Sequence, residues 1–501
     1  MCPQVSRLSW LVPAGFLLLL GACAVGPDFE RPAPVSAGSF VEAGLPAQIA
    51  AVPGAAAAGA GTAQNLRTGS ALVQDWWTLF HSEALNRFVA QALRDNPSLA
   101  AASANLRQAQ ETLAANRGNL EFPSVNAQAS AARERTTNAT FGQPGGNRFS
   151  LYNAQVDVSY TFDAFGGVRR QLEALQAQVD YQQYQLRATQ LSLTANIVTA
   201  VIRDAQLRDQ LAALHDVEKM QREGLTIVER RFALGAVTRT DVLNQSAALA
   251  QTLTSLAPLE RQRAQTRHLL ALYAGKAPSE VDLAALDLSH LELPADLPVS
   301  LPSELVRQRP DILAAEALLH AASAQVGVAT ANLYPQFTLT GDYGSSANSA
   351  SKLFNPSSAV WGLSAGVVQP LFRGGALRAQ RRAAEDAFDA SAATYRQTVL
   401  AAFANVADAL QALNFDTQAL AAQVDAYEQS RAAADLAQAQ FKAGAVGYLS
   451  LLSAQQSYRQ AAVNLAQARA DRFTDTAALF QAIGGGWWNE PAPAQPVASA
   501  N

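Results

Sequence analysis

The chain has 501 residues, of which 49% are apolar, and its 37 basic and 41 acidic side chains leave a net charge of −4. This near balance, with no basic stripe interleaved with aromatic residues, argues against a nucleic-acid-binding protein. After the N-terminal region no run reaches the ~18 uninterrupted apolar residues of a membrane-spanning helix, which argues against a helical membrane protein. The expected partners are proteins and lipid.

Residues 1–22 have the features of a secretory signal. Arg7 precedes an apolar run, and two small residues stand directly before Cys23. The arrangement resembles the bacterial lipoprotein signal, in which the cysteine becomes the lipidated first residue of the mature chain. The other interpretation is a plain signal peptide that is cut nearby. The resemblance implies a covalent lipid such as palmitate on Cys23, and Ala24 at the next position implies the outer membrane, facing the periplasm.

Residues 23–75 are rich in Pro, Gly and Ala and show little periodicity, which predicts an extended leader that lies over the fold. A first structural repeat covers residues 76–276. It is expected to begin near Trp76 and to continue through a helix from about Glu83 to Asn119. Pro123 then stops the helix and favours extended chain.

Strict alternation of apolar and polar residues follows that proline, and the same pattern follows Pro335 in the second half of the chain. A period of two predicts strands, here four strands in two hairpins. The expected strands cover about residues 122–132, 149–163, 335–343 and 359–372. The hairpin loops, Arg133 to Arg148 and Gly344 to Ser358, are rich in Gly, Ser, Asn and Thr and should face water.

A Gly-Gly pair ends each second strand, and the pattern then becomes helical. Long helices are expected from Val168 to about Leu234 and from Ala376 to about Ala443. The first spans 67 residues, about 100 Å at ~1.5 Å per residue. Return helices are expected at about residues 240–273 and 448–482. Apolar residues at steps of three, four or seven predict that these helices pack as coiled coils.

The turns between these helices show that the chain is a tandem duplication. Phe232-Ala-Leu-Gly-Ala-Val237 returns as Phe441-Lys-Ala-Gly-Ala-Val446, a separation of 209 residues. Each copy is expected to be a tight helical hairpin whose glycine takes a left-handed conformation. A linker at 277–302, a second repeat at 303–486 and a tail at 487–501 complete the chain.

The four strands raise a question of closure. An open sheet in hydrocarbon would leave unpaired backbone groups along both edges, and known membrane barrels need at least about eight strands. Either several chains contribute to one barrel, or the sheet does not lie in the membrane. The expected lipid on Cys23 favours the shared barrel.

Several short motifs resemble the TolC-like outer membrane efflux protein family, and its lipoprotein, NodT-type branch in particular. They are Cys23-Ala-Val-Gly-Pro-Asp28 with Arg31-Pro32, Asp163-Ala-Phe-Gly-Gly-Val-Arg-Arg170, Leu371-Phe-Arg-Gly-Gly375 and Gly484-Gly-Gly-Trp487. The resemblance implies a mainly α-helical homotrimer in which four transmembrane strands per chain form a β-barrel. A long antiparallel α-helical barrel of coiled-coil hairpins would continue it across the periplasm. The implied partners are a periplasmic adaptor (membrane fusion protein) and an inner-membrane pump of the RND type.

The same resemblance places a periplasmic aperture at the hairpin turns. Family channels narrow at the leucine of a Tyr-Leu pair and at an acid four residues later, and the matching positions here are Leu449 and Ser453. Because Ser453 carries no charge, a ring of acids is absent at that level. Asp241 is the candidate that could supply one. Its plainer interpretation is a capping box with Thr238, since acids are favoured at helix N-termini.

Apolar residues at the turns are candidate contacts for an adaptor, because apolar side chains at an exposed tip mark interaction surfaces. The candidate residues are Phe232, Gly235, Val237, Phe441, Gly444 and Val446. For the four apolar residues the alternative is packing of the two hairpins against each other. For the two glycines it is turn geometry.

Catalysis and cofactor binding find no support in the sequence. Five histidines are scattered without metal-ligand spacing, no common catalytic or phosphate-binding motif occurs, and the only cysteines are Cys2 and Cys23. The resemblance to the efflux protein family implies instead a passive outer-membrane duct for small molecules such as drugs. Two alternatives are a duct for polypeptide secretion and a lipid-anchored periplasmic coiled-coil spacer without a pore. An enzyme is the weakest alternative.

Overall fold

The structure, a computed structural model, describes residues 24–33, 39–40, 46–70, 72–137, 145–281 and 291–489. The chain divides into two compact units, each assembled from three segments. Unit 1 comprises Met1–Pro32, Asn105–Gln183 and Ala314–Arg396, and unit 2 comprises Ala33–Ala104, Tyr184–Leu313 and Gln397–Asn501. Each unit therefore draws on both sequence repeats, and the compact units do not coincide with the repeats.

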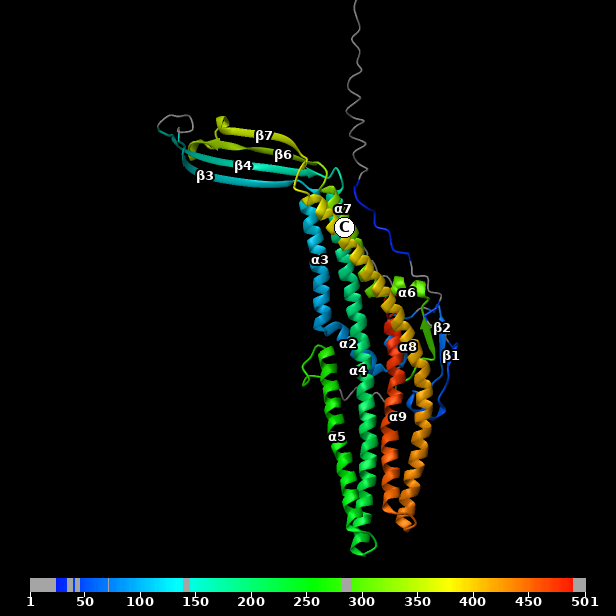
Figure 1. The fold of residues 1–501 in the computed structure, drawn as a ribbon. Coiled ribbons are helices and arrows are strands. Elements are labelled where there is room, and N and C mark those ends of the chain that lie inside the picture. The colour runs from blue at the N-terminus through cyan, green and yellow to red at the C-terminus, as the bar shows by residue number, and fades with distance from the viewer. Residues whose placement is uncertain are drawn as a thin grey trace, which may run out of the picture. The chain divides into compact units, whose positions relative to one another are not determined.

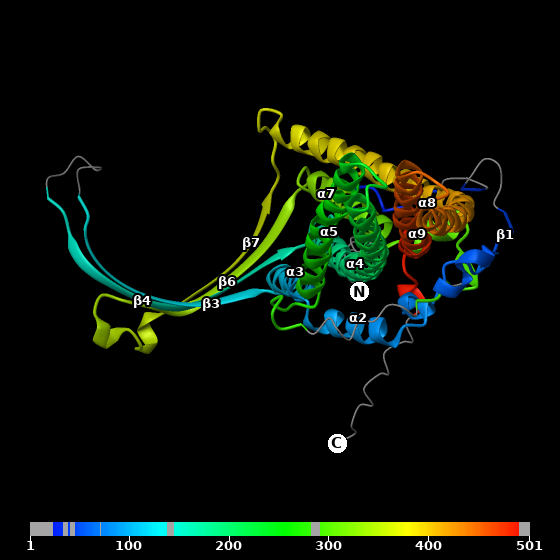
Figure 2. The ribbon, with the colours of Figure 1, turned by 90° about the horizontal axis from the view of Figure 1, so that it is seen from below.

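Unit 1 contains a four-stranded antiparallel sheet in the order β3-β4-β6-β7. Its strands are β3 (Ser124–Arg135), β4 (Arg148–Phe162), β6 (Gln336–Ala347) and β7 (Ala359–Val368). The two hairpins come from the two repeats and join where β4 pairs with β6, so that Val156 lies opposite both Ala127 and Tyr343. Figure 2 shows the four strands side by side in a curved sheet. Strands β3 and β7 are its edges.

The four expected strands are present, with three differences at their ends. β3 runs on to Arg135, into the segment expected as a loop from Arg133, because its last residues pair with β4 as far as Arg148. β6 runs on to Ala347, into the segment expected as a loop from Gly344, because its last residues pair with β4 as far as Tyr152. Cross-strand pairing outweighs the low strand propensity of Gly and Ser there. β7 ends at Val368 rather than near residue 372, and Pro370, which has no N–H to donate, follows two residues later.

The register of the sheet separates an apolar face from a polar face. Large apolar side chains on one face are exposed, including Trp361 at 77%, Leu363 at 74%, Tyr343 at 68% and Val125 at 65%. The polar face carries hydrogen-bonded pairs, such as Asn126 with Asp157 at 3.1 Å and Ser346 with Asn153 at 2.7 Å. A sheet with one exposed apolar face is incomplete as a water-soluble surface.

Helices α3 (Pro97–Glu121), α4 (Gly167–Ala233), α7 (Pro310–Ala331) and α8 (Ala376–Ala443) have at least part of their length in unit 1. In the described part of the chain, α7 is the one helix long and apolar enough to cross a membrane, and 56% of that stretch is buried inside the protein. Such burial is typical of a core helix.

One expected helix is wrong. The stretch from Glu83 to Asn119 forms two helices, α2 (Glu83–Asp95) and α3, with Asn96 between them in an extended conformation. Pro97 starts α3, and a residue that precedes proline is pushed out of the helical region. Asn96 also fixes the break, because its side-chain nitrogen donates to the carbonyl of Tyr273 at 2.9 Å.

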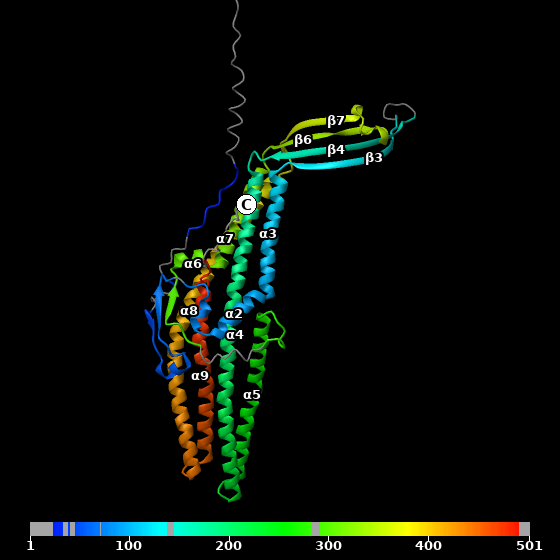
Figure 3. The ribbon, with the colours of Figure 1, turned by 180° about the vertical axis from the view of Figure 1, so that it is seen from behind.

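Unit 2 holds the two helical hairpins. α4 returns as α5 (Arg239–Tyr273), and α8 returns as α9 (Tyr448–Ala482), all within one residue of the expected bounds. The other helical elements are η2 (Trp76–Phe80), α6 (Pro302–Gln308) and the short η1 (Pro53–Ala58) and η6 (Trp487–Asn489). Figures 1 and 3 show the hairpins from opposite sides. Trp76, Phe80, Phe473 and Phe480 form an aromatic core beside them.

The leader and the linker, both expected to lack long elements, together build a small sheet in unit 2. β2 (Gln64–Thr68) from the leader pairs in parallel with β5 (Asp296–Val299) from the linker, and β1 (Gln48–Ile49) pairs with the other edge of β2. Five residues of leader and four of linker are too short to show a strand pattern alone. Their pairing across more than 220 residues makes them strands.

Candidate functional site

The two hairpin turns have the same backbone. Gly235 has φ of 72° and Gly444 has φ of 80°, the left-handed conformation that glycine adopts without a steric penalty. In each turn one N–H reaches back five positions, from Ala236 to Arg231 at 2.9 Å and from Ala445 to Gln440 at 2.8 Å. These bonds close the helix ends in the manner of a Schellman motif. Turn geometry therefore accounts for both glycines.

The apolar residues of the two turns pack into one cluster, here called the tip cluster. Its buried members are Val228, Val242, Ala437, Phe441, Tyr448 and Leu451. Val237 and Val446 pack against it and are partly buried. Phe441 is 2% exposed, whereas its counterpart Phe232 is 41% exposed. Three of the four apolar candidates, Phe441, Val237 and Val446, thus pack in the cluster, as the alternative interpretation expected. Contact of the candidates with an adaptor stays a prediction.

The three aperture candidates lie at the starts of the return helices. Asp241 forms the expected capping box: its carboxylate accepts from the N–H of Thr238 at 2.8 Å, and its own N–H donates to the Thr238 hydroxyl at 3.3 Å. Leu449 is 68% exposed, and Ser453 is also exposed. Nothing in these contacts tests an aperture, so that role stays a prediction.

Tyr448 is a tip residue that sequence reasoning did not single out as a candidate. It is 4% exposed and stacks edge-on against Phe441, with ring centroids 6.3 Å apart. Burial and, secondarily, the charge of Asp241 raise the pKa of Tyr448 to about 12. The signal was in the sequence, because Tyr448 begins the return helix directly before Leu449, but its burial depends on packing between hairpins.

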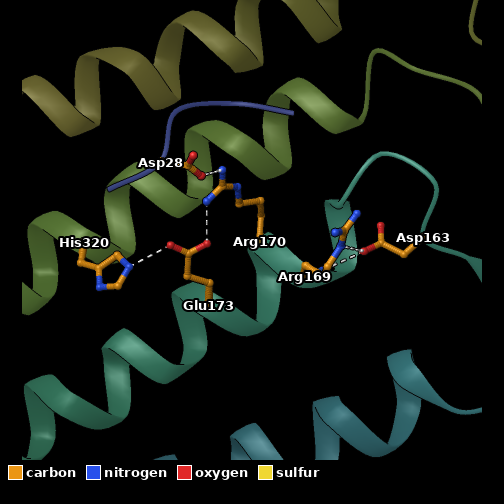
Figure 4. A network of polar contacts seen from close by, with 6 residues as sticks. All are labelled: Asp28, Asp163, Arg169, Arg170, Glu173 and His320. Atoms are coloured by element: carbon orange, nitrogen blue, oxygen red, sulfur yellow. Dashed lines mark hydrogen bonds and ion pairs between the residues drawn. The ribbon is translucent and has the colours of Figure 1, made fainter. Parts of the chain in front are cut away.

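A second candidate region joins the first described residues of the leader to α4 and α7 in unit 1. Asp28 lies 2.5 Å from Arg170, Arg170 lies 2.8 Å from Glu173, and Glu173 lies 2.8 Å from His320. Figure 4 shows these side chains as one chain of polar contacts. Burial lowers the pKa of Arg170, but Glu173 and Asp28 outweigh burial and raise it above its ordinary value. The arginine therefore stays charged.

Further contacts hold the same leader segment. The ring of Phe29 stacks on His320 with centroids 4.3 Å apart, and Arg31 pairs with Glu316 at 2.6 Å. Gly26 approaches the α7 backbone so closely that a Cβ there would lie 2.5 Å from the Cα of Gly327. Two of the short motifs, the one ending in Asp28 and the one ending in Arg170, are therefore halves of one contact.

Asp163, which opens that second motif, has a separate role. Its carboxylate accepts from the N–H groups of Val168 and Arg169 at 3.1 and 3.0 Å and pairs with the Arg169 side chain at 3.3 Å. These are free N–H groups of the first turn of α4, and an acid is favoured there. Asp163 thus fixes the start of the long helix directly after β4.

A comparable contact between distant segments lies in unit 2. Arg309 is 8% exposed, holds Asp311 at 2.6 Å and donates to the carbonyl of Ala482 at 2.8 Å, near the end of α9. The indole of Trp487 donates to the carbonyl of Gln308 at 2.7 Å. The glycine-rich motif before Trp487 thus closes the unit against the start of the second repeat.

The described residues hold no cluster of three or more His, Cys, Asp or Glu side chains fit to bind a metal ion. Cys23, the expected lipid site, and residues 490–501 of the expected tail lie outside the described residues. The candidate regions are therefore built from packing, capping and ion pairs.

Comparison with known proteins identifies the family. The model named "Outer membrane efflux protein" matches twice, over residues 88–276 and 301–485. The chain belongs to the outer membrane efflux protein family. It is therefore an outer-membrane protein, and its class is that of efflux channels rather than enzymes.

Two curated relatives cover nearly the whole chain. The pyoverdine export outer membrane protein OpmQ of Pseudomonas aeruginosa is 31% identical over 486 residues, covering 94% of this chain and 96% of the relative. The probable efflux pump outer membrane protein TtgC of Pseudomonas putida is 30% identical over 500 residues, covering 99% and 98%. Both names describe outer-membrane components of export systems.

Solved structures agree on the fold. The outer-membrane channel OprN has a TM-score of 0.80 and 30% identity, covering 93% of this chain and all of its own. The CmeC outer membrane channel of Campylobacter jejuni also has a TM-score of 0.80, at 20% identity and 93% coverage of this chain, which shows the fold alone. The expected resemblance to TolC-like channels is confirmed.

Proposed function

We propose that the protein is the outer-membrane duct of a tripartite efflux system, a passive homotrimer that carries small molecules out of the cell. The single observation that carries this proposal is the four-stranded sheet of unit 1, which has an exposed apolar face and, among the described residues, two edges without partner strands. Membership of the family supports it.

The edges of the sheet support a barrel shared between chains. In the part of the chain that the structure describes, β3 and β7 each pair on one side only, so each has a row of backbone groups without a partner strand there. Such edges are not tolerated in hydrocarbon, and four strands are about half of the smallest known membrane barrel. Three chains would supply twelve strands, with the apolar face toward lipid and the row of Asn126, Asp157 and Asp342 toward the lumen.

A lipid on Cys23 fits the leader contacts. The N–H of Val25, two residues beyond Cys23, donates to the carbonyl of Phe165 at 3.0 Å, and Phe165 lies in the junction between β4 and α4. The first described residues are therefore held beside the base of the sheet. A lipid attached at Cys23 would enter the membrane close to the barrel, and no other cofactor is expected.

The partners are proposed from the family and from the tips. Relatives named for pyoverdine export, antibiotic efflux and toluene efflux indicate pumps that export small molecules. A periplasmic adaptor and an inner-membrane pump of the RND type are the proposed partners. The adaptor would contact the exposed part of the turns, where Phe232 and Leu449 present apolar surface. Leu449, Ser453 and Asp241 would line the aperture.

The alternatives differ in what they require of the sheet. A coiled-coil spacer without a pore needs no apolar sheet face, so the exposed Trp361 and Leu363 argue against it. A duct for polypeptide secretion would use the same architecture, and the names of the relatives favour small molecules.

The first test is the mass of the protein extracted from outer membranes in mild detergent. Three chains that separate only on heating are expected, together with restored drug resistance in a strain that lacks its own channel. A folded monomer would overturn the duct and favour the spacer. A trimer that restores secretion of a polypeptide, but no drug resistance, would favour the secretion duct.

A matched pair of substitutions tests the face that meets lipid. Leu363 and Ser364 are neighbours on β7, both exposed in the single chain, but they point to opposite faces of the sheet. An arginine on the lipid face of a barrel costs ~2–4 kcal/mol near the bilayer midplane, whereas lumen positions tolerate it. Leu363→Arg is expected to reduce the trimer in outer membranes by about tenfold or more, and Ser364→Arg to leave it unchanged. Equal effects would contradict the barrel.

A further inference from the structure

Three buried glutamines lie inside the helical hairpins of unit 2, between two apolar clusters. Gln245 and Gln455 are 0% exposed and Gln221 is 2% exposed. The tip cluster lies on one side of them. On the other side lies a second cluster, formed by Val217, Ala434, Tyr458 and Ala462. We refer to Gln221, Gln245 and Gln455 as the glutamine layer.

The helix positions place these three residues at one level. Gln221 follows Val217 of the second cluster by four residues on α4, and Val228 of the tip cluster comes seven residues later. On α9, Gln455 stands four residues after Leu451 and three before Tyr458. Steps of three, four and seven keep residues on one helix face. The layer therefore interrupts an apolar stripe on both helices.

α5 contributes the third member by direct contact. The side-chain nitrogen of Gln245 donates to the backbone carbonyl of Gln221 at 2.8 Å, and Val242 of the tip cluster stands three residues before it. Gly224 gives Gln245 its space, because a Cβ there would lie 3.1 Å from that nitrogen. The packing around the layer is therefore specific to a polar side chain.

The hydrogen-bonding capacity of the layer is mostly unused within the protein. Both polar atoms of Gln455 and the side-chain oxygens of Gln221 and Gln245 are buried without a protein partner. In the described residues eleven buried side-chain atoms lack one, and six belong to this layer, Tyr448 and Thr252. Buried polar groups without partners are rare and destabilise the packing that holds them. The largest group of these atoms thus lies in the glutamine layer.

We propose that the glutamine layer is a weak joint between the two hairpins. The second cluster holds the hairpins together above it, and the tip cluster packs them below it. When the tips separate, the tip cluster loses apolar contacts, but the glutamine amides gain hydrogen bonds to water, which offsets part of the loss. The tips therefore open as a segment bounded by the layer, while the helices above stay packed.

The consequence for transport rests on the proposed function. In a duct whose lower end lies at the turns, an opening segment of this kind sets how readily the end widens. Apolar residues at the layer would make the tips more stable and the duct less permeable. The joint itself is a property of one chain and is measurable without a pump.

The test compares two neighbouring glutamines on α9. Gln455→Leu removes a buried amide with little change of volume, and Gln456→Leu makes the same change at an exposed position. Gln455→Leu is expected to slow amide exchange at the tips, in residues 221–233 and 443–455, by about tenfold, because the closed state no longer buries unpaired groups. Gln456→Leu should leave exchange unchanged. The measurement is hydrogen exchange by mass spectrometry on the lipidated protein from outer membranes.

A second variant should change amide exchange at the tips in the opposite direction and serves as a control for misfolding. Gln455→Glu places a carboxylate in the layer, which at neutral pH favours the hydrated, open tips and should speed exchange there by about tenfold or more. Exchange above the layer, around Val217 and Tyr458, should not change in either variant. Unchanged or faster tip exchange in Gln455→Leu would overturn the joint.

The transport readout separates this inference from the proposed function. If the wild-type protein restores drug resistance, Gln455→Leu should restore it less well at equal amounts of protein, while Gln456→Leu restores it fully. A wild-type protein that restores no resistance would contradict the proposed efflux duct and leave the exchange results valid. Full resistance with slower exchange would overturn the link between the joint and transport.

Discussion

The two helical hairpins have the same turn conformation, but equivalent side chains differ in burial and in partners. α5 and α9 each have 35 residues, and the turns before them have the same conformation. Arg263 of α5 and Arg472 of α9 are equivalent positions, 209 residues apart. Arg263 is partly exposed and pairs with Asp204 at 3.2 Å, whereas Arg472 is 0% exposed. The two copies keep the same helix lengths and turn conformation, and the residues around each side chain decide its role.

The different partners of the two arginines explain the difference in burial. Leu413 stands in the second hairpin where Asp204 stands in the first, so Arg472 has no acid at that place. It donates instead to Gln64 of the leader at 2.9 Å, to the carbonyl of Thr62 and to the hydroxyl of Thr417. Burial lowers the pKa of Arg472, and the charge of the nearby Asp416 acts in the opposite direction. The leader therefore covers the second hairpin and makes it the more buried of the two.

The largest difference between the hairpins is expected at the phenylalanines of the turns. Phe441→Ala removes a ring that is 98% buried in the tip cluster and under Arg231, whose guanidinium lies 4.6 Å from it. Local stability of the tips should fall by about 3 kcal/mol or more. Phe232→Ala, at a ring that is 41% exposed, should cost less than about 1 kcal/mol. Amide exchange of the turn peptides measures both.

Phe232→Ala is also the control for any loss of adaptor contact. If the adaptor binds the exposed ring, this variant should lose drug resistance while its tips keep their exchange rates. Equal destabilisation by the two variants would contradict the packing difference between the turns.

A second difference concerns pH. Burial raises the pKa of Asp416 in α8 to about 8, and the charges of Asp475 and Asp471 act in the same direction. The equivalent of Asp416 in α4 is Leu207, which does not titrate. A raised pKa in the folded state means that the neutral form is favoured, so stability is greatest at low pH and falls as pH rises toward 8. After allowance for solvent screening the loss is about 2 kcal/mol.

Asp416→Asn mimics the neutral form and should abolish this dependence. The local opening free energy of α8 around residue 416, from amide exchange corrected for intrinsic rates, should fall between pH 5 and pH 8 in the wild type and stay level in the variant. The equivalent stretch of α4 around residue 207 is the internal control. A slope of equal size in α4 would assign the effect to other groups.

Much of the frame could be predicted from the sequence. The bounds of α8 and α9 agree with the expected 376–443 and 448–482, because a Gly-Gly pair precedes each long helix and a glycine turn follows it. These are local signals, and local signals set element ends. The strands were predictable for the same reason, since alternation marks each of them alone.

The contacts between distant segments could not be predicted. Phe232 and Phe441 stand in almost the same local sequence, yet one is exposed and the other buried, because burial depends on which helices lie over them. The contact of Asp28 with Arg170 spans 142 residues of chain. The resemblance of the two motifs to the family marked both residues but did not pair them. The break at Asn96 does have a local signal, because Pro97 disfavours a helical conformation for the residue before it.

A smaller difference is expected at the starts of the return helices. Asp241 completes a capping box on α5, whereas the N-cap of α9 is Gly447, which provides no side-chain cap, and Ser450 stands where Asp241 stands in the first copy. Asp241→Ala should destabilise the start of α5 by about 1 kcal/mol. Ser450→Ala should have almost no effect. Exchange of the first-turn amides of α5 and α9 measures this pair. A loss at Ser450 as large as at Asp241 would show that the two ends are capped alike.

The smallest difference is expected at the glycines, where the two hairpins should respond alike. Gly235 and Gly444 have φ of 72° and 80°, and a Cβ at either would meet no atom within 4 Å. The cost of alanine is therefore backbone strain alone, about 1–2 kcal/mol in each turn. Gly235→Ala and Gly444→Ala should speed exchange of their own turns by similar factors. A clearly larger effect at Gly444 would mean that the buried Phe441 beside it transmits the strain into the tip cluster. In that case the cost of alanine at the glycine would depend on side-chain packing, which differs between the hairpins, although the two turns have the same backbone conformation.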